Sequence, residues 1–178
     1  MYIGLEFNID FGKKGNQLKD ILLGIDISAY DWVLNHQSIQ ELYIVNENGT
    51  GINRLKSYTL DCDNDTDLNL YDYTHCDEKK YIPGEILLKE QSADKYYFLF
   101  LSLFGFKKGD KITKISNIEE LMESKCELFF TVYDSKGMAV IVKDQVILEK
   151  IHSNLKKIGG TNISLMDLEY CRRFNMFS

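Results

Sequence analysis

Seven carboxylates lie between residues 61 and 78, and that stretch holds no lysine or arginine. The chain has 27 acidic and 21 basic side chains, so once these seven are set aside 20 acidic residues remain against 21 basic ones. Carboxylates this dense can do two kinds of chemistry. They can supply oxygen ligands to a hard cation, or they can attract a cationic partner. The sequence therefore predicts a negative surface lobe on an otherwise balanced body.

The cation interpretation rests on alternating aspartates at the start of this segment, Asp61, Asp63, Asp65 and Asp67. A calcium loop of the EF-hand type places a glycine at its sixth position and a bidentate glutamate at its twelfth. Counted from Asp61, these positions hold Thr66 and Asp72. The match is incomplete, so a calcium-binding acidic loop is kept only as an alternative.

Softer metal ligands occur in the same segment, at Cys62, His75 and Cys76. A structural zinc site has two closely spaced ligand pairs, whereas only His75 and Cys76 are close here. We therefore expect no metal and no cofactor.

Nucleophilic catalysis needs a thiol or hydroxyl beside a positioned base. Cys126 and His152 have no spacing that brings them together, and His36 falls in a predicted turn. The four cysteines contain no Cys-x-x-Cys pair, which favours free thiols in a reducing compartment. We expect no catalytic residue, and a non-enzymatic protein is favoured.

The partner interpretation gains from two tyrosines in the acidic segment, because aromatic side chains often carry binding energy inside a charged interface. We predict a basic protein partner, captured as acidic immunity-like or regulatory proteins capture cationic targets. The predicted contact residues are Asp61, Asp63, Asp65, Asp67, Tyr71, Asp72 and Tyr73. The alternative is that the charges only keep a long exposed loop hydrated.

Other partners fit the composition poorly. A net charge of -6 and the lack of a basic stripe disfavour nucleic acid. The longest apolar run, 96–106, is far shorter than the roughly 20 residues that cross a membrane. No basic stretch followed by an apolar core opens the chain, so we expect a cytoplasmic protein. The oligomeric state is not predicted.

Hydrophobic periodicity and turn residues define the elements of the first half. Leu18, Ile21 and Leu22 share one face of a predicted helix at 16–23, and Gly24 is placed to end it. Strands are predicted at 2–8, 30–35 and 41–46, and irregular structure at about 50–80.

The second half begins with a short helix predicted at 85–90. The aromatic run at 95–106 predicts a central strand covered on both faces. Ser116 and Glu119 fit a capping box for a helix that ends near Ser124, and Asp144 is a suitable N-cap for a helix that ends at Gly159 and Gly160. Between these helices we expect a hairpin of strands 126–133 and 138–143, and after them a strand at 161–165.

Several short patterns are spread along the chain: Gly4 and Phe7, 20–22, 25–27, Tyr30 with Trp32, Tyr96 with Tyr97, 107–109, Lys143 with Asp144, and Gly160 with 162–163. Together they resemble a family of small bacterial proteins catalogued only as a domain of unknown function. The likeness covers most of the chain and is loosest across 50–80. It implies a shared α+β fold and brings no activity, substrate or catalytic residue.

The element order predicts a single α+β domain over 1–178, with a mostly antiparallel sheet and about four helices packed on it. Beside protein binding, a small-molecule-binding protein or enzyme with a pocket near the aromatic strand 96–106 is kept as an alternative function.

Overall fold

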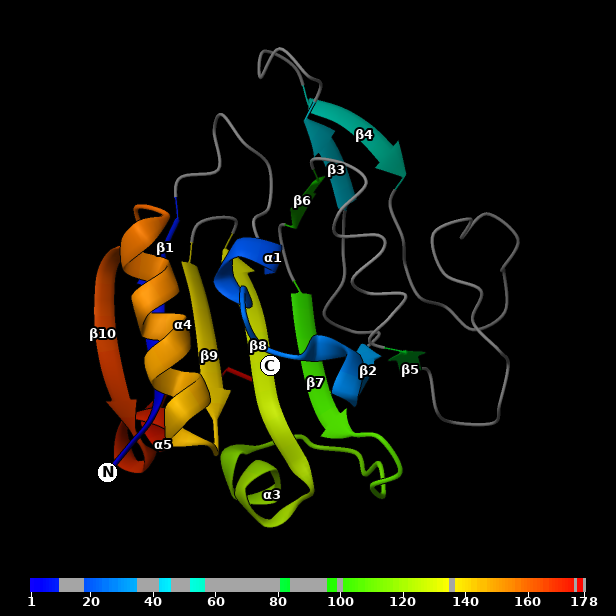
Figure 1. Cartoon of the computed structure of the whole chain (residues 1–178), viewed down its shortest axis with the longest axis vertical. Helices are drawn as coiled ribbons and strands as arrows, with labels where there is room; N and C mark the ends of the chain where they lie inside the picture. Colours follow the sequence, from blue (N-terminus) through cyan, green and yellow to red (C-terminus); the bar gives the residue numbers. More distant parts are fainter. Residues whose placement is uncertain are drawn as a thin grey trace.

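A seven-stranded antiparallel sheet forms the centre of the computed structural model (Figure 1). The structure describes residues 1–9, 18–34, 42–45, 52–56, 81–83, 96–98, 101–134, 137–174 and 176–177. Every neighbouring pair of strands in this sheet is antiparallel. In spatial order the strands are β10 (Thr161–Asp167), β1 (Tyr2–Asn8), β9 (Gly137–Val142), β8 (Cys126–Asp134), β7 (Leu101–Lys107), β2 (Tyr30–Leu34) and β5 (Tyr81–Pro83).

A second sheet has three strands in the order β4 (Ile52–Lys56), β3 (Leu42–Val45) and β6 (Tyr96–Phe98). Two expectations are corrected here. The strand predicted over 95–106 is two strands, because β6 pairs with β3 whereas β7 pairs with β8 and β2. The stretch predicted to be irregular at about 50–80 contains β4. The helix predicted at 85–90 lies outside the described residues, and the single domain stays a prediction.

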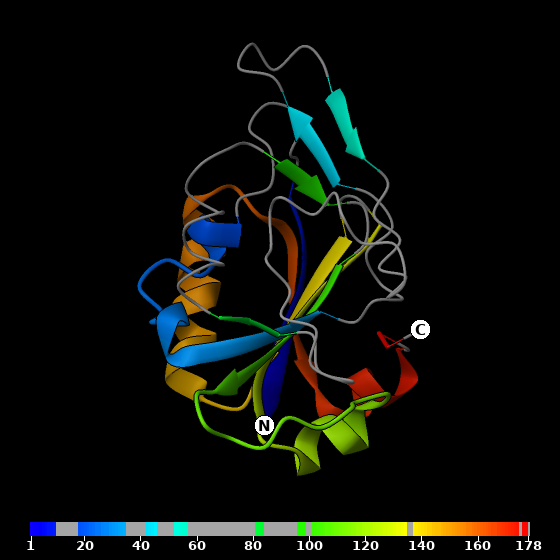
Figure 2. The ribbon, with the colours of Figure 1, turned by 90° about the vertical axis from the view of Figure 1, so that its right-hand side faces the viewer.

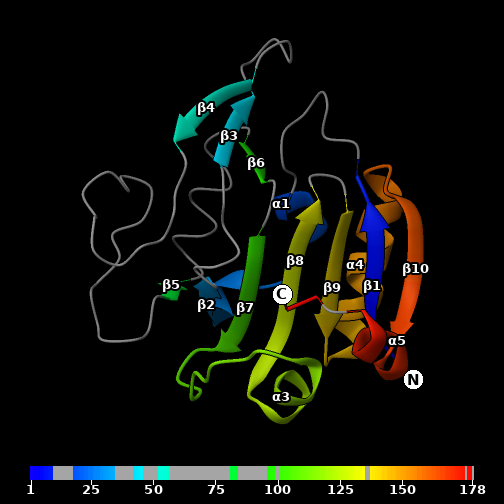
Figure 3. The same ribbon diagram turned by 180° about the vertical axis from the view of Figure 1, so that it is seen from behind.

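Helices cover the main sheet unequally. Its front face, as we call it, packs against α1 (Leu18–Ile21), the 3-10 helix η1 (Ile27–Ala29) and α4 (Gln145–Lys157), as Figure 1 shows. The short α5 (Leu168–Arg173) lies on the opposite, back face, and α3 (Ile118–Glu123) contacts it at the lower end of the sheet (Figures 2 and 3). The described part thus confirms the predicted α+β fold with a mostly antiparallel sheet and four α-helices.

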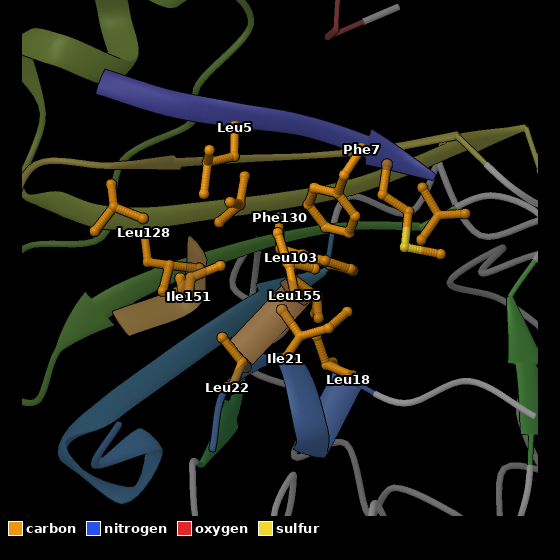
Figure 4. Packing of buried hydrophobic residues seen from close by; sticks show 14 of the residues in the cluster. Leu5, Phe7, Leu18, Ile21, Leu22, Leu103, Leu128, Phe130, Ile151 and Leu155 are labelled. Atoms are coloured by element: carbon orange, nitrogen blue, oxygen red, sulfur yellow. The ribbon is translucent and has the colours of Figure 1, made fainter. Parts of the chain in front are cut away.

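The strand register sorts side chains onto the two faces row by row. Leu5, Val140, Phe130 and Leu103 lie opposite one another on β1, β9, β8 and β7, and all four belong to the front core. Figure 4 shows Leu5, Phe130 and Leu103 facing the helix side chains Ile151, Leu155, Ile21 and Leu18. Burial of these apolar side chains, at roughly 25 cal/mol per Å², is the main term that holds α1 and α4 on the sheet.

Helix caps follow the expected chemistry with one shift. Asp144 Oδ1 accepts hydrogen bonds from the backbone N–H groups of Val146, at 2.8 Å, and Ile147, at 3.3 Å, as predicted for an N-cap. The predicted capping box at Ser116 and Glu119 is wrong by one residue. Asn117 is the N-cap of α3 and accepts from the Glu120 N–H at 2.8 Å, while the Glu120 carboxylate accepts from the Ser116 N–H at 2.7 Å.

Within the described residues, no helix combines the length and the apolar character needed to cross a membrane.

Candidate functional site

The seven predicted partner contacts, Asp61, Asp63, Asp65, Asp67, Tyr71, Asp72 and Tyr73, all lie outside the described residues. The described strands on either side locate where the acidic segment leaves and rejoins the fold. It follows β4, which ends at Lys56 in the three-stranded sheet, and precedes β5, which begins at Tyr81 on the edge of the main sheet. After this segment the chain therefore re-enters the main sheet at the edge opposite β10.

A polar row crosses the back face of the main sheet. Ser102 on β7 lies opposite Thr131 on β8, and the same row continues through Ala139 and Glu6 to Ser164 on β10. Ser102 is 6% exposed and Thr131 2%, and their hydroxyl oxygens are 3.3 Å apart. The row is thus buried at β7 and β8, and it reaches the surface at β10, where Ser164 is exposed.

Glu6 is the charged member of this row, and two tyrosines hold its carboxylate. The Tyr133 hydroxyl donates to Glu6 Oε1 at 2.6 Å, and the Tyr170 hydroxyl donates to Oε2 at 2.5 Å. The bond to Glu6 is the main reason that the pKa of Tyr170 is raised, because a phenolate could not donate to the carboxylate. The three side chains, which we call the Glu6 cluster, join β1, β8 and α5.

Aromatic rings surround the Glu6 cluster. Phe174 meets the Tyr133 ring edge-on, with centroids 5.3 Å apart, and stacks on Tyr170 at 6.2 Å. Further along the back face Phe177 stacks on Phe129, with centroids 4.8 Å apart. The end of the chain therefore lies across the back face (Figure 3) and places apolar rings beside the polar row.

Sequence reasoning missed α5, which brings Tyr170 to Glu6. A signal was present in the chain, since Asp167 stands immediately before the helix and Arg172 and Arg173 fall in its last turn. Asp167 Oδ1 accepts from the Tyr170 N–H at 2.8 Å, so it is the N-cap. The role of Glu6 itself has no local signal.

The described thiols are unsuited to nucleophilic attack. Cys126 and Cys171 are free and buried, as predicted for cysteines in a reducing compartment. Burial raises the pKa of Cys126 to about 12 and that of Cys171 to about 11, so both remain protonated near neutral pH. Cys62 and Cys76 lie outside the described residues.

Most of the histidines and candidate metal ligands lie outside the described residues. His152 is half-buried on α4, and desolvation, with Lys156 nearby, lowers its pKa. His36 and His75 lie outside the described residues, as does the whole predicted calcium loop. Among the residues that the structure places, no three His, Cys, Asp or Glu side chains gather in a way that could hold a metal ion.

Comparison with known proteins identifies the family. A family model described as protein of unknown function (DUF2691) matches residues 2–176, and the chain belongs to this family. It is similar to an uncharacterised protein, YncE, of Bacillus subtilis strain 168, with 27% identity over 151 residues that cover 85% of this chain and 82% of that protein. No solved structure matches the chain. The predicted resemblance to a family of unknown function is confirmed.

Proposed function

We propose that this member of the DUF2691 family is a non-enzymatic protein that binds a basic partner protein, in an immunity-like or regulatory role, through the acidic segment 61–78. The observation that carries the proposal is the charge distribution. Seven carboxylates stand in a stretch, 61–78, that holds no lysine or arginine, and the rest of the chain is balanced, with 20 acidic and 21 basic residues. Such a lobe attracts a cationic protein from a distance and increases its rate of association.

Two features of the described fold support this role. The described strand that follows the segment, β5, is at the edge of the main sheet opposite β10, and the one that precedes it, β4, is in the three-stranded sheet. The described cysteines are buried, protonated thiols, which fit a structural role better than catalysis. Free thiols also fit a reducing compartment, and we propose a cytoplasmic location on that ground.

The test compares three immobilised proteins in capture from cell lysate at low and high salt, with mass spectrometry as the readout. The first is the native chain. The segment variant carries Asp61→Asn, Asp63→Asn, Asp65→Asn and Asp67→Asn. The body variant removes the same number of charges outside the segment, with Asp20→Asn, Asp110→Asn, Glu123→Gln and Glu149→Gln.

The proposal expects a basic protein that the native chain and the body variant capture at low salt and that the segment variant does not. High salt should weaken this capture, because it screens exposed charges. Equal capture by all three proteins, or capture that is insensitive to salt, would contradict a recognition role for the acidic segment. The body variant separates the position of the charges from their number.

A second candidate function is small-molecule binding at the polar row of the back face. Ser102 on β7 belongs to this row, so the row reaches the strand near which a pocket was predicted, 96–106. The supporting observation is the Glu6 carboxylate, which accepts hydrogen bonds from two phenols that pack against Phe174 and which shares a sheet row with the buried hydroxyls of Ser102 and Thr131. A few fixed polar groups among apolar rings are typical of ligand sites. A ligand with hydrogen-bond donors, such as an amine, would suit a carboxylate, which accepts hydrogen bonds.

A thermal-shift screen of metabolites tests this second candidate. A ligand at 100 times its dissociation constant stabilises a protein by about 2.7 kcal/mol, which such a screen detects. A true ligand of the row should lose its shift in the Glu6→Gln variant and keep it in the Glu149→Gln variant, which changes the same residue type on the exposed face of α4. A shift that survives Glu6→Gln would place the ligand elsewhere.

A further inference from the structure

Among the strands that the structure describes, none pairs with the outer edge of β10. The seven-stranded sheet ends at this strand, which pairs with β1 on one side only. Figures 1 and 3 show β10 at the margin of the sheet, and five of its seven side chains are exposed. An edge strand presents a row of unpaired backbone N–H and C=O groups, which is a template for pairing with another strand.

The two edges of the sheet differ in how they are protected. At one edge β5 has three residues and ends in Pro83, and a short strand with a proline is poorly suited to pairing. At the other edge β10 has seven residues and contains no lysine, arginine or proline. Its one charged residue is Asp167, at the end of the strand. The short length and the proline that protect the edge at β5 are therefore absent from β10, whose own irregularity lies near its start.

The pairing of β10 with β1 is regular over 164–166 and shifts register on both sides, with the extra residue on β1 between Tyr2 and Gly4 at the far end. Asn162 has a positive φ of 52°, and the pairing with β1 shifts register between Glu6 and Asn8 at this point. Such a bulge bends the strand and disturbs pairing locally. The stretch left for a new partner is 163–167, and its middle residue is Leu165. That side chain is 44% exposed, although it is a large apolar residue.

We propose that two copies of this chain associate through β10, in an antiparallel pair with a two-fold axis at Leu165. In this register Leu165 lies opposite its own copy and each covers the other. Ser164 lies opposite Met166 of the second copy, and Ile163 lies opposite Asp167, so no like charges meet. The two main sheets then form one continuous sheet of fourteen strands.

The self-complementary register favours a second copy over an unrelated strand. A two-fold interface is the commonest arrangement of soluble oligomers, and it needs one patch that matches itself. Leu165 at the centre satisfies this requirement because apolar side chains directly opposite each other stabilise a strand pair. The axis is perpendicular to the sheet, so the front faces of both copies, with their α4 helices, lie on the same side.

The test measures molar mass by light scattering after size-exclusion chromatography, over a series of protein concentrations. The native chain should approach twice its monomer mass of 20.7 kDa as the concentration rises. Leu165→Lys and Leu165→Glu should each raise the dimer dissociation constant at least about tenfold, because each places like charges opposite one another on the axis. An equimolar mixture of the two variants should restore association, since opposite charges then face each other.

A matched control is Leu23→Lys, which introduces the same substitution at an exposed leucine that follows α1, away from β10. This variant should dimerise as the native chain does. Restoration in the mixture also shows that both Leu165 variants are folded. A native chain that is monomeric at every concentration overturns the proposal, as does a dimer that both Leu165 variants retain, a mixture that stays monomeric, or an equal loss in the Leu23→Lys control.

Discussion

The effect of Gly137→Ala on the free energy of unfolding should depend on which residue occupies position 133, because the Tyr133 ring lies close to Gly137. A Cβ atom added at Gly137 would lie 2.5 Å from Cε2 and 2.9 Å from Cζ of the Tyr133 ring. The φ of Gly137 is not in the left-handed region, so the backbone itself accepts alanine. The ring is therefore the main obstacle to Gly137→Ala, and it must move.

The cost follows from what the ring holds. Moving it breaks the 2.6 Å hydrogen bond from the Tyr133 hydroxyl to Glu6, and a bond to a charged group contributes about 1.5–3 kcal/mol. Replacing glycine with alanine offsets about 0.4–1 kcal/mol of this by restricting the unfolded chain. We expect Gly137→Ala to lower the free energy of unfolding by about 1–2 kcal/mol. In a Tyr133→Ala background, Gly137→Ala should leave the free energy of unfolding unchanged or raise it.

Urea unfolding followed by circular dichroism measures all four proteins of this double-mutant cycle. The variant Tyr133→Phe serves as a control, because it keeps the ring but removes the bond to Glu6. Its Gly137→Ala penalty should be smaller than in the native background and larger than in the Tyr133→Ala background. An equal penalty in all three backgrounds would refute the packing of Tyr133 over Gly137.

Three further predictions concern single buried or capping groups. Burial raises the pKa of Cys126 from 9.0 to about 12, so the folded chain keeps a proton that the unfolded chain loses between these two pH values. The free energy of unfolding should therefore be unaffected by this thiol below about pH 9 and fall by about 1.4 kcal/mol per pH unit from there to about pH 12. Urea unfolding above pH 9 should therefore show a shallower loss for Cys126→Ala, and parallel slopes would contradict the burial of this thiol. Asn154 Nδ2 donates to the carbonyls of Ile21, at 3.0 Å, and Leu23, at 2.8 Å. Asn154→Asp should therefore destabilise the protein by about 1–3 kcal/mol at neutral pH, and acid should restore stability because a protonated carboxyl can donate again. Thermal melts that show no recovery in acid would argue against these bonds. Asp144→Ala should cost about 1 kcal/mol through loss of the α4 cap, and an unchanged urea midpoint would contradict the cap.

Local signals predicted the parts of the fold in which neighbours in the chain decide the structure. The helix that begins after Asp144 ends at Lys157 with Ile158 as its C-cap, and the next residue is Gly159, whose φ of +81° suits glycine. The hairpin of β8 and β9 follows from two apolar strands that are close together in the sequence. In both cases caps, turns and periodicity act within a few residues.

Partner choice between distant strands could not be predicted in this way. The run 95–106 contains no proline and only Gly105 near its end, so composition suggests one strand. The structure divides it between two sheets because β6 pairs with β3 and β7 with β8. The strands predicted at 30–35 and 41–46 are confirmed, yet they also belong to different sheets.

The Glu6 cluster shows the same limit for a site. Alternation along β1 indicates that Glu6 points away from Leu5, but its partners are 127 and 164 residues distant in the chain. Such contacts depend on the order of strands in the sheet and on the docking of α5. The acidic segment is the opposite case, because its charge density is visible in the sequence alone.

The measurement that tests the central proposal most directly is the association rate of the captured basic protein with the native chain, the segment variant and the body variant. The Debye length falls from about 10 Å at 0.1 M salt to about 3 Å at 1 M, so steering by exposed charges is strong at the first concentration and weak at the second. We predict that the native chain and the body variant associate at least about tenfold faster than the segment variant at low salt, and that the difference disappears at high salt. Equal rates for all three proteins at low salt would contradict the proposal that segment 61–78 recognises the partner.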